Sequence, residues 1–469
     1  MRGPLERRPR RWIAWILLLI LLAVTAQTTY NVIRPSLARR AGFYHFYDFG
    51  VLLDKLTLLR ETGTLYETDR PDFLEPGSRV FKYPPPNAAL LLLLDSEPRA
   101  NLPSAELAAH ARPFVRLSLF CLVATLGVVL IVLRPPIWRA LVLVVVFLNW
   151  QAHWETLIGP QFELLLLLFL TVVWLGIRSG RPWLAGIPIG IAGALKIYPW
   201  VLGAHFLARR QWRSVLWLGA GALVSMTAAA FVVGWGLTLE YVTRILPNQG
   251  GTSAHLENLS LLGNLTRLTQ TLTGSAAIPP IPVTGLAAVL TRPGPSDAPL
   301  LAWVLALPII AALLYASRRA LRSAAALPAH TRESLAFGLS ISLALPLLPT
   351  SWANYQSLLA LPVMIAGCLA RPWREDRWTW IFLIAAALLA AVGVDEIVRQ
   401  PQAEVWRRML RPIHCFRPLR DVLTWIQSPP GAQGVALARS FTPLFVWLAH
   451  LRLLRTPPPL AQGRPQDVR

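Results

Sequence analysis

The sequence predicts an all-α protein that crosses a membrane several times. The chain has 469 residues, of which 54% are hydrophobic and only 15% are charged. A water-soluble domain of this length would carry more charge. Several apolar runs also reach or approach the ~20 residues that a helix needs to cross the hydrocarbon core. We therefore predict an all-α polytopic integral membrane protein.

The charge of the chain points to lipids as partners. The formal net charge is +21, almost all of it from arginine. In a soluble protein this excess would indicate a nucleic-acid partner. In a membrane protein, basic residues gather in cytoplasmic loops and face anionic lipid head groups. We expect membrane lipids as partners and no nucleic acid.

No residue pattern indicates a metal or another cofactor. Cys121, Cys368 and Cys415 are scattered along the chain, and the first two fall inside apolar runs, so we expect them to pack. The acidic triplet Glu67-Thr68-Asp69 is interpreted as solvated surface. We therefore expect neither a metal nor a bound cofactor.

Residues 1–34 are predicted to form a cytoplasmic N-terminus and a first transmembrane helix. Four arginines at positions 7 to 11 precede a long apolar run at about 12–33, which shows no clean small-residue cleavage site. A retained helix therefore fits better than a cleaved signal peptide. The basic flank places the N-terminus in the cytoplasm.

Residues 35–111 are predicted to form a first outer loop that contains amphipathic helices. The segment is rich in acidic residues. Downstream of Asp48, apolar residues recur at Val51, Leu52, Leu56 and Leu59, a spacing that predicts an amphipathic helix. The apolar run 87–94 is too short to span, and we expect it to lie in the interface or dip into it.

Residues 112–394 are predicted to form the transmembrane helical core, which includes a second outer loop at 236–298. The C-terminal part, 395–469, is predicted to hold a loop, a last transmembrane helix near 432–450 and a tail. Its many arginines leave the orientation of this part open. With re-entrant segments included, we expect about 10–12 helices. The expected spans of the core are 113–133, 140–157, 161–177, 214–235, 299–317, 333–348, 354–370 and 377–394.

The stretch between Arg181 and Arg209 predicts a re-entrant helix pair. Both arginines have cytoplasmic character, yet only about 25 apolar residues separate them, too few for two crossings. Lys196 and Pro199 stand in the middle of this run. A charge and a proline at that depth favour a broken helix that enters and returns. The alternative is one kinked span, which would place every later loop on the opposite side of the membrane.

Polar residues in the predicted outer turns converge on one face. Asp48 stands among aromatic residues just after the first span, where it is either a helix N-cap or a general base. Lys196 lies deep, which favours a partner for its charge: a lipid-linked phosphate or, with less weight, a structural ion pair. Arg267 has the character of an ordinary surface arginine.

These residues belong to an ordered set of short motifs. Together, their order and spacing over about residues 12–370 resemble glycosyltransferase family 87, polyprenol-phosphate-mannose-dependent mannosyltransferases with the GT-C fold. The motifs are Asp48-Phe49, Leu65-Tyr66, Lys82-Tyr83-Pro84-Pro85, Gly159-x-Gln161, Arg181-Pro182-Trp183-Leu184-Ala185-Gly186, Leu195-Lys196-Ile197-Tyr198-Pro199, Asn258-Leu259-Ser260-Leu261-x-Gly263 with Arg267, and Pro349-Thr350-Ser351-Trp352.

The resemblance implies an inverting hexosyltransferase in the plasma (inner) membrane. Such an enzyme moves a sugar, most simply mannose, from a polyprenyl-phosphate donor to a lipid or glycan acceptor on the outer side. Asp48 matches the essential acid of the first outer loop and would act as general base. Lys196 and Arg267 would hold the donor phosphate. Further expected substrate-binding residues are Tyr83, Gln161, Asn258, Trp352 and Asn354.

Three departures from the family pattern stand out. The family usually has Asn-Gln-Ser where this chain has Asn258-Leu259-Ser260, and Gly-Gln-x-Asn where it has Gly159-Pro160-Gln161-Phe162-Glu163. Asn354 stands where many members carry a histidine, and an amide cannot carry its charge. His255 and His153 are candidates to compensate.

Two other functions remain open at this stage. A transporter or flippase of a lipid-linked or anionic solute would also use a lysine in a broken helix. Such a protein should show related halves, and the sequence shows no internal repeat. A catalytically inactive family member, suggested by Asn354, is the third possibility.

Overall fold

The structure is helical throughout the part of the chain that it describes. It is a computed structural model that describes residues 47–67, 81–95, 97–100, 102, 104–248, 258–273, 298–348, 351–390 and 436–455. Across these ranges there is no strand, only an isolated antiparallel bridge between Asn258 and Trp352. The all-α prediction is confirmed. The expected first span, 12–33, and the arginine-rich segment 395–431 lie outside the described residues.

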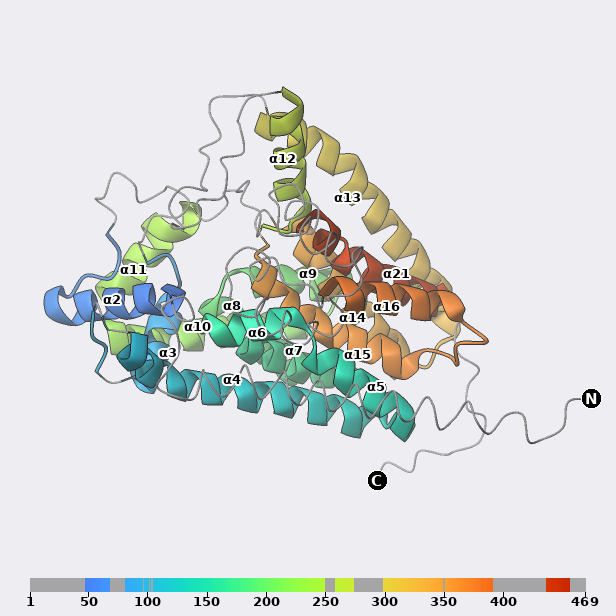
Figure 1. Ribbon diagram of the computed structural model, residues 1–469, viewed down its shortest axis with the longest axis horizontal. Helices are drawn as coiled ribbons and strands as arrows, with labels where there is room; N and C mark the ends of the chain where they lie inside the picture. Colours follow the sequence, from blue (N-terminus) through green and yellow to red (C-terminus); the bar gives the residue numbers. More distant parts are fainter. Residues whose placement is uncertain are drawn as a thin grey trace, which may run out of the picture.

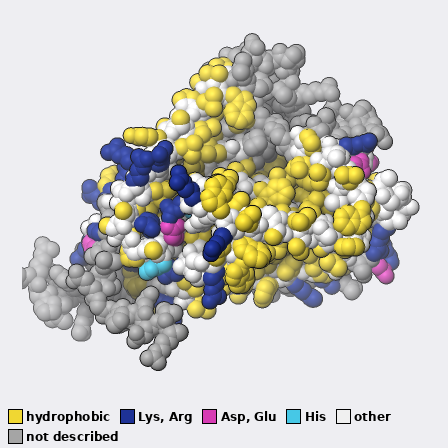
Figure 2. Space-filling model, turned by 180° about the vertical axis from the view of Figure 1, so that it is seen from behind, with side chains coloured by type: hydrophobic (Ala, Val, Ile, Leu, Met, Phe, Trp, Pro, Cys, Tyr) yellow, Lys and Arg dark blue, Asp and Glu magenta, His cyan; other side chains and the backbone are white. Residues whose placement is uncertain are grey.

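Three helices in the described ranges are long and apolar enough to cross a membrane: α4 (Ser104–Leu133), α10 (Trp212–Val233) and α13 (Ala298–Ser323). The bent pair α5 (Ile137–Leu148) and α6 (Gln151–Ile158) qualifies as a fourth span. Figure 2 shows a face covered largely by apolar side chains, with a group of Lys and Arg side chains at its left. Such an exposed apolar face suits contact with lipid rather than water.

The remaining helices are shorter and pack between and beside these spans (Figure 1). In the view of Figure 1, α2, α3 and α11 gather at one end of the molecule, and α12 stands beside the start of α13. The longer of them are α2 (Tyr47–Thr62), α3 (Pro85–Leu94), α7 (Glu163–Arg178), α8 (Pro182–Leu195), α9 (Gly203–Ala208), α11 (Trp235–Glu240), α12 (Leu261–Thr273), α14 (Ala329–Leu347), α15 (Ala360–Leu369), α16 (Arg377–Ala390) and α21 (Thr442–Arg455).

The expected single span at 140–157 is bent by 47° at Asn149 and Trp150. The Asn149 side-chain amide donates to the Val145 carbonyl at 2.8 Å and so occupies an acceptor at the end of α5. The Trp150 indole donates to the Gln356 carbonyl at 2.8 Å. Gln356 lies in the 3-10 helix η8 (Ala353–Leu359), so this contact directs α6 toward η8. The prediction missed the bend because its cause is a contact distant in sequence.

The break and return of the chain that were predicted for the re-entrant pair are present. After α8 the chain breaks at Lys196 and Ile197, forms the 3-10 helix η3 (Tyr198–Leu202) and continues into α9. The Trp200 indole donates to the Gly190 carbonyl at 3.2 Å, so η3 folds back over α8. The 14 residues of α8 form a helix about 21 Å long at 1.5 Å per residue, which is shorter than the ~30 Å hydrocarbon core.

The directions of α8 and α10 exclude the kinked-span alternative. A Cβ on Gly186 would lie 2.4 Å from the Ser214 carbonyl, and one on Gly190 would lie 2.2 Å from the Leu218 carbonyl. Residue numbers therefore rise together along both helices, which run parallel and start at the same end. A single kinked span would make them antiparallel. The two glycines let the backbones approach closely, as small residues do between membrane helices.

Arginines join the helix ends at one end of the molecule. Arg209 forms an ion pair with Glu333, and Arg178 donates to the Ser334 hydroxyl at 3.5 Å, both at the start of α14. Arg139 donates to the carbonyls of Cys368 and Ala370 at the end of α15.

The last helix, α21, reaches the same end. Arg452 pairs with Asp376 at 2.6 Å, just before α16. A Cβ on Gly338 of α14 would meet the His450 ring, so α21 packs closely against α14. We call the end that holds Arg139, Arg178, Arg209 and Arg452 the arginine end. Of these four residues, Arg209 was given cytoplasmic character in the sequence analysis.

Candidate functional site

Lys196 lies at the opposite end of α8 from Arg181, inside a buried cluster. Its ammonium forms an ion pair with Glu163 and donates to the Gln161 side-chain carbonyl at 2.9 Å. Lys196 is 4% exposed and Glu163 is 0% exposed. The partner of this deep charge in the structure is a carboxylate, which is the structural ion pair that the sequence analysis gave less weight. We call Lys196, Gln161, Glu163, Tyr83 and Tyr355 the lysine cluster.

Local structure favours this charge pair. Lys196 follows the C-terminus of α8, and Glu163 is the first residue of α7. A cation is stabilised at the C-terminal end of a helix dipole and an anion at the N-terminal end. The turn between α6 and α7, which contains Pro160, presents Gln161 and Glu163 together. Two helix ends thus bring opposite charges into contact where water is excluded.

Aromatic rings cover the ammonium. The Lys196 nitrogen lies 5.5 Å from the centre of the Tyr83 ring and 5.1 Å from that of Tyr355. Both distances suit cation–π contact. Tyr355 in turn stacks on Tyr198 with ring centres 4.1 Å apart. The cluster is therefore charged at its centre and aromatic at its walls.

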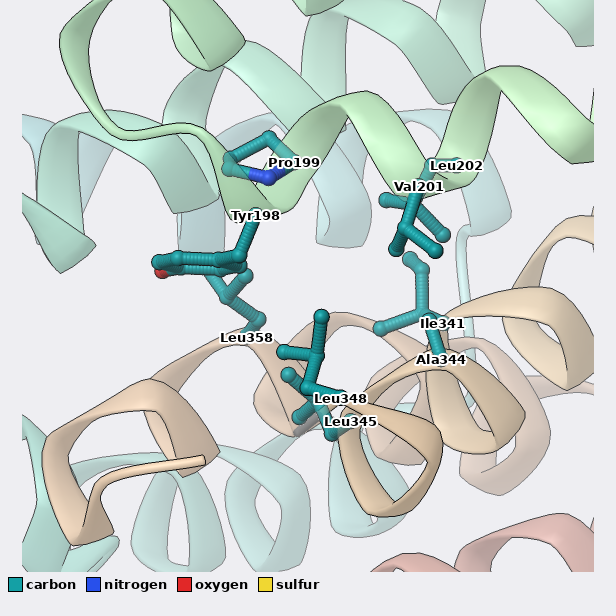
Figure 3. A pocket seen from close by; sticks show the side chains of 9 residues that line it. All are labelled: Tyr198, Pro199, Val201, Leu202, Ile341, Ala344, Leu345, Leu348 and Leu358. Atoms are coloured by element: carbon teal, nitrogen blue, oxygen red, sulfur yellow. The ribbon is translucent and has the colours of Figure 1, made fainter. Parts of the chain in front are cut away.

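Tyr198, which stacks on Tyr355, also lines an apolar pocket. Figure 3 shows this pocket between η3 and α14, with the Tyr198 ring forming one wall. Aliphatic side chains, among them Leu202, Ile341 and Leu345, form the rest of the lining. Two stacked tyrosine rings therefore separate an apolar pocket from a buried ammonium.

The predicted outer loop reaches the lysine cluster through Tyr83. The Tyr66 hydroxyl donates to the Tyr83 carbonyl at 2.9 Å, and Phe81 lies edge-on to the Tyr83 ring. Farther along, the Asn87 side chain donates to the Leu195 carbonyl at 3.4 Å. The segment from Phe81 to α3 thus folds over the break in the re-entrant pair.

The triplet interpreted as solvated surface is partly engaged. Glu67 forms an ion pair with Lys55 of α2. The rest of the triplet lies outside the described residues. Among the residues that the structure describes, no group of three His, Cys, Asp or Glu side chains is placed to hold a metal ion.

Asp48 lies in α2, where the predicted amphipathic helix is found, with Leu52 and Leu56 buried. The Asp48 side chain is outside what the structure describes. The next residue, Phe49, packs on Phe114 with ring centres 6.2 Å apart, and Phe114 packs on Phe162 at 4.8 Å. Since Phe162 stands between Gln161 and Glu163, three rings link the start of α2 to the lysine cluster.

A second cluster forms where two predicted motifs meet. The Asn258 side-chain oxygen accepts from the backbone N–H of Ser351 at 2.8 Å and of Ser260 at 3.2 Å. The Leu259 N–H donates to the Ser351 carbonyl at 2.7 Å, and Asn258 bridges to Trp352. Residues almost a hundred positions apart are therefore held side by side.

Arg267 completes this second cluster and is no ordinary surface arginine. It is 9% exposed and donates to the Asn258 carbonyl at 3.1 Å and to the Asn264 side-chain oxygen at 2.6 Å. Burial lowers the pKa of its guanidinium to about 10. Gly263 is required because a Cβ there would lie 2.4 Å from the Asn258 amide nitrogen. We call Asn258, Arg267, Ser351 and Trp352 the asparagine cluster.

The helix η8 joins the two clusters. Trp352 precedes it in the asparagine cluster, and Tyr355 lies in the lysine cluster. Asn354 stands between them and is half-buried. Of the two histidines proposed to compensate, His255 lies outside the described residues, and His153 is fully buried 4.9 Å from the Phe147 ring. All predicted site residues with described side chains therefore belong to one connected region.

Sequence reasoning missed two contributors to this region. Glu163 was noted as a polar residue of an outer turn and as a departure from the family pattern, but its pairing with Lys196 was missed, although an acid that opens an apolar helix is a signal for a buried partner. Arg439 is almost fully buried and pairs with Glu155. One arginine among many in the C-terminal part gave no signal of its own.

Fold and site together define a helical membrane protein with a charged, aromatic-lined site at the end opposite to the arginine end. The family model of glycosyltransferase family 87 matches residues 81–346, more than half of the chain. The chain belongs to this family of glycosyltransferases, as the motifs indicated. The matched residues include most of the lysine cluster and half of the asparagine cluster, and they end before Ser351.

Two curated relatives carry the same name, polyprenol-phosphate-mannose-dependent alpha-(1-2)-phosphatidylinositol mannoside mannosyltransferase. The one from Mycolicibacterium smegmatis is 28% identical over 242 residues, which cover 49% of this chain and 47% of the relative. The one from Mycobacterium tuberculosis is 29% identical over 216 residues, 45% of this chain and 41% of the relative. The chain thus spans about half the length of the curated relatives it matches. No solved structure matches it significantly.

Proposed function

We propose that this chain is a membrane mannosyltransferase. It takes mannose from a polyprenyl-phosphate donor and transfers it to a hydroxyl of a lipid or glycan acceptor. Support comes from the family and from the names of the two relatives, which specify a polyprenol-phosphate-mannose donor and a phosphatidylinositol mannoside acceptor. The observation that carries the proposal is the buried ammonium of Lys196 among tyrosine rings, beside the segment that contains Asp48.

The donor phosphate is assigned to Lys196. A lysine ammonium has three N–H donors, and Gln161 and Glu163 accept from two of them. The third serves a phosphate oxygen, and Arg267 supplies a second cation from the asparagine cluster. The tyrosine rings suit the faces of a sugar.

Asp48 is assigned as the general base. Its carboxylate takes the proton from the acceptor hydroxyl as the hydroxyl oxygen attacks the anomeric carbon. The bond between that carbon and the phosphate oxygen breaks, and polyprenyl phosphate leaves with the electron pair. Lys196 stabilises the charge that develops on the leaving phosphate. Attack opposite the leaving group inverts the configuration at the anomeric carbon.

The reaction is assigned to the outer face of the inner membrane. Positively charged residues favour the cytoplasmic side of membrane proteins. If the arginine end faces the cytoplasm, the two clusters face outward and the N-terminus begins inside. This orientation also exposes Asp48 to acceptors outside the cell, while the donor approaches within the lipid.

The test is transfer of labelled mannose by the purified full-length protein. Polyprenyl-phosphate mannose labelled in the sugar is mixed with phosphatidylinositol mannoside, and products are separated by chromatography. The proposal expects the label in a larger glycolipid, and no transfer when a nucleotide-linked mannose replaces the lipid donor. Movement of intact donor between leaflets of a proteoliposome, with no new covalent product, would instead support a flippase.

A further inference from the structure

Two adjacent residues near the C-terminus, Arg439 and Ser440, hold the walls of the candidate site together. Arg439 is 1% exposed. Its guanidinium binds both oxygens of the Glu155 carboxylate, at 2.5 and 2.8 Å. This planar, two-point geometry is the strongest form of a carboxylate–arginine contact. Glu155 lies on α6, so the pair ties the C-terminal segment to the bent span.

Arg439 also binds η8. Its Nε donates to the Gln356 side-chain oxygen at 3.2 Å, and its Nη2 donates to the Ala353 carbonyl at 3.3 Å. Gln356 returns a hydrogen bond to the Arg439 carbonyl at 3.2 Å. Asn354 and Tyr355 stand between these two contacts, and the Tyr355 ring covers the Lys196 ammonium. One buried guanidinium therefore fixes the backbone on both sides of the residues that line the lysine cluster.

Ser440 binds the other wall. The Asn264 amide donates to the Ser440 hydroxyl at 3.0 Å, and the hydroxyl lies 3.2 Å from the Asn264 side-chain oxygen. That same oxygen accepts from Arg267 at 2.6 Å. Ser440 thus fixes the amide that orients the Arg267 guanidinium within the asparagine cluster.

We propose that Arg439 and Ser440 are positioning residues of the transferase, and that the C-terminal segment is part of its active-site assembly. This inference rests on the proposed function. Arg439 sets η8 against α6, and Ser440 sets Arg267 on α12. Both residues lie beyond residues 81–346, the part of the chain that the family model matches. Arg439 acts on the surroundings of Lys196, and Ser440 acts on Arg267. Substitutions of Arg439 and Ser440 can therefore be tested separately.

The first test uses Ser440→Ala, the milder change. Removal of one hydrogen bond to Asn264 frees the Arg267 guanidinium, and the KM for the lipid donor rises about 3- to 10-fold. The acceptor KM, the kcat and the thermal midpoint stay near wild type. Ser317→Ala is the matched control, because Ser317 binds the Trp447 indole of α21 at 2.9 Å far from both clusters. This control leaves the donor KM unchanged.

A double-mutant cycle separates positioning from general stability. Ser440→Ala is combined with Arg267→Gln, and the donor KM is measured for all four proteins. If Ser440 acts through Arg267, its substitution adds nothing once Arg267 is gone. Independent, additive effects on the donor KM would overturn the proposal for Ser440.

Arg439→Lys tests the second anchor. Lysine keeps the charge but not the planar fork, so η8 is released from α6 and the donor KM rises at least about 10-fold. An unchanged donor KM in a folded Arg439→Lys protein would overturn this assignment. If that variant does not fold, the Ser440 cycle still decides whether the C-terminal segment acts on the site.

A binding assay distinguishes failure of this inference from failure of the proposed function. Tryptophan fluorescence of each protein is titrated with polyprenyl phosphate, which needs no transfer to be detected. If wild type binds this lipid and both anchor variants bind it equally well, the positioning role is wrong. If wild type neither binds the lipid nor transfers mannose, the proposed function itself is wrong, and the inference falls with it.

Discussion

The two ends of this protein use positive charge in opposite ways. At the arginine end, Arg139 donates to helix-end carbonyls, and Arg452, whose side chain is 34% exposed, pairs with the buried carboxylate of Asp376. At the site end, Lys196 is withdrawn from water against Glu163 and two tyrosine rings. The first arrangement joins helix ends. The second keeps a charge at the place where we propose that the lipid-linked phosphate binds.

The two ends are expected to contribute differently to stability and to activity. A buried ion pair gives little net stability, because desolvation of the two charges offsets their attraction. The ion pair of the lysine cluster therefore adds little net stability to the packing of its helices. Arg139, in contrast, donates to carbonyls at a helix end that would otherwise lack a donor. We expect substitutions at the arginine end to lower stability alone, and substitutions at the site end to lower activity even where stability is restored.

The largest effect is expected for Lys196→Met. Loss of the ammonium removes the proposed phosphate ligand, so kcat/KM for the donor falls at least about 100-fold. The single variant also leaves the Glu163 carboxylate buried without its cation, at a cost of about 3 to 5 kcal/mol. The double variant Lys196→Met/Glu163→Gln should recover the thermal midpoint but not transfer. Recovery of transfer in the double variant would show that Lys196 serves only the fold.

Asn258→Ala is expected to damage both properties. The backbone N–H groups of Ser351 and Ser260 lose their acceptor, and each unsatisfied buried group costs about 1 to 3 kcal/mol. Because the two motifs then separate, the donor KM should also rise. Thermal unfolding and donor titration of the same preparation measure the two effects. A variant with wild-type stability would contradict the role of this amide as the link between the motifs.

Arg139→Met is expected to lower stability alone. Two carbonyls at the end of α15 lose charged hydrogen bonds, with a loss of about 1 to 3 kcal/mol in unfolding free energy. Transfer per folded molecule should equal that of wild type. Reduced specific activity at full folding would break the division between the two ends.

The smallest effect is a pH dependence at Asp376. Burial raises the pKa of this carboxyl, but hydrogen bonds from Thr379 and Arg452 outweigh burial and hold the pKa below its usual value. A lowered pKa stabilises the folded protein above the unfolded pKa of ~3.9, and the gain is lost as pH falls through the folded value. The thermal midpoint of Asp376→Asn should therefore lie below wild type at neutral pH and approach it below about pH 4. A constant difference down to pH 3 would contradict this.

Local signals in the sequence predicted more of the fold than of the site. The mid-run Lys196 and the paired arginine clusters were enough to predict the re-entrant segment, because burial of a charge in lipid has few solutions. The bend at Asn149 was missed because Trp150 finds its acceptor on η8, a contact distant in sequence.

The site was predicted as a set of residues but not as a set of contacts. Asn258 and Trp352 were both expected in it, yet nothing in the periodicity pairs them directly. The ion pairs of Glu163 and Arg439 could be identified only from the structure, because the partner of a buried charge is determined by packing and not by spacing in the sequence.

The central claim is that Asp48 and the lysine cluster act on one lipid-linked sugar. The most direct measurement compares initial rates of mannose transfer from polyprenyl-phosphate mannose by wild type and Asp48→Asn, with polyprenyl phosphate binding measured on both. The account predicts that Asp48→Asn binds the lipid as wild type does but transfers no detectable mannose. Full transfer by Asp48→Asn would contradict the assignment of the base and, with it, the placement of the reaction beside Lys196.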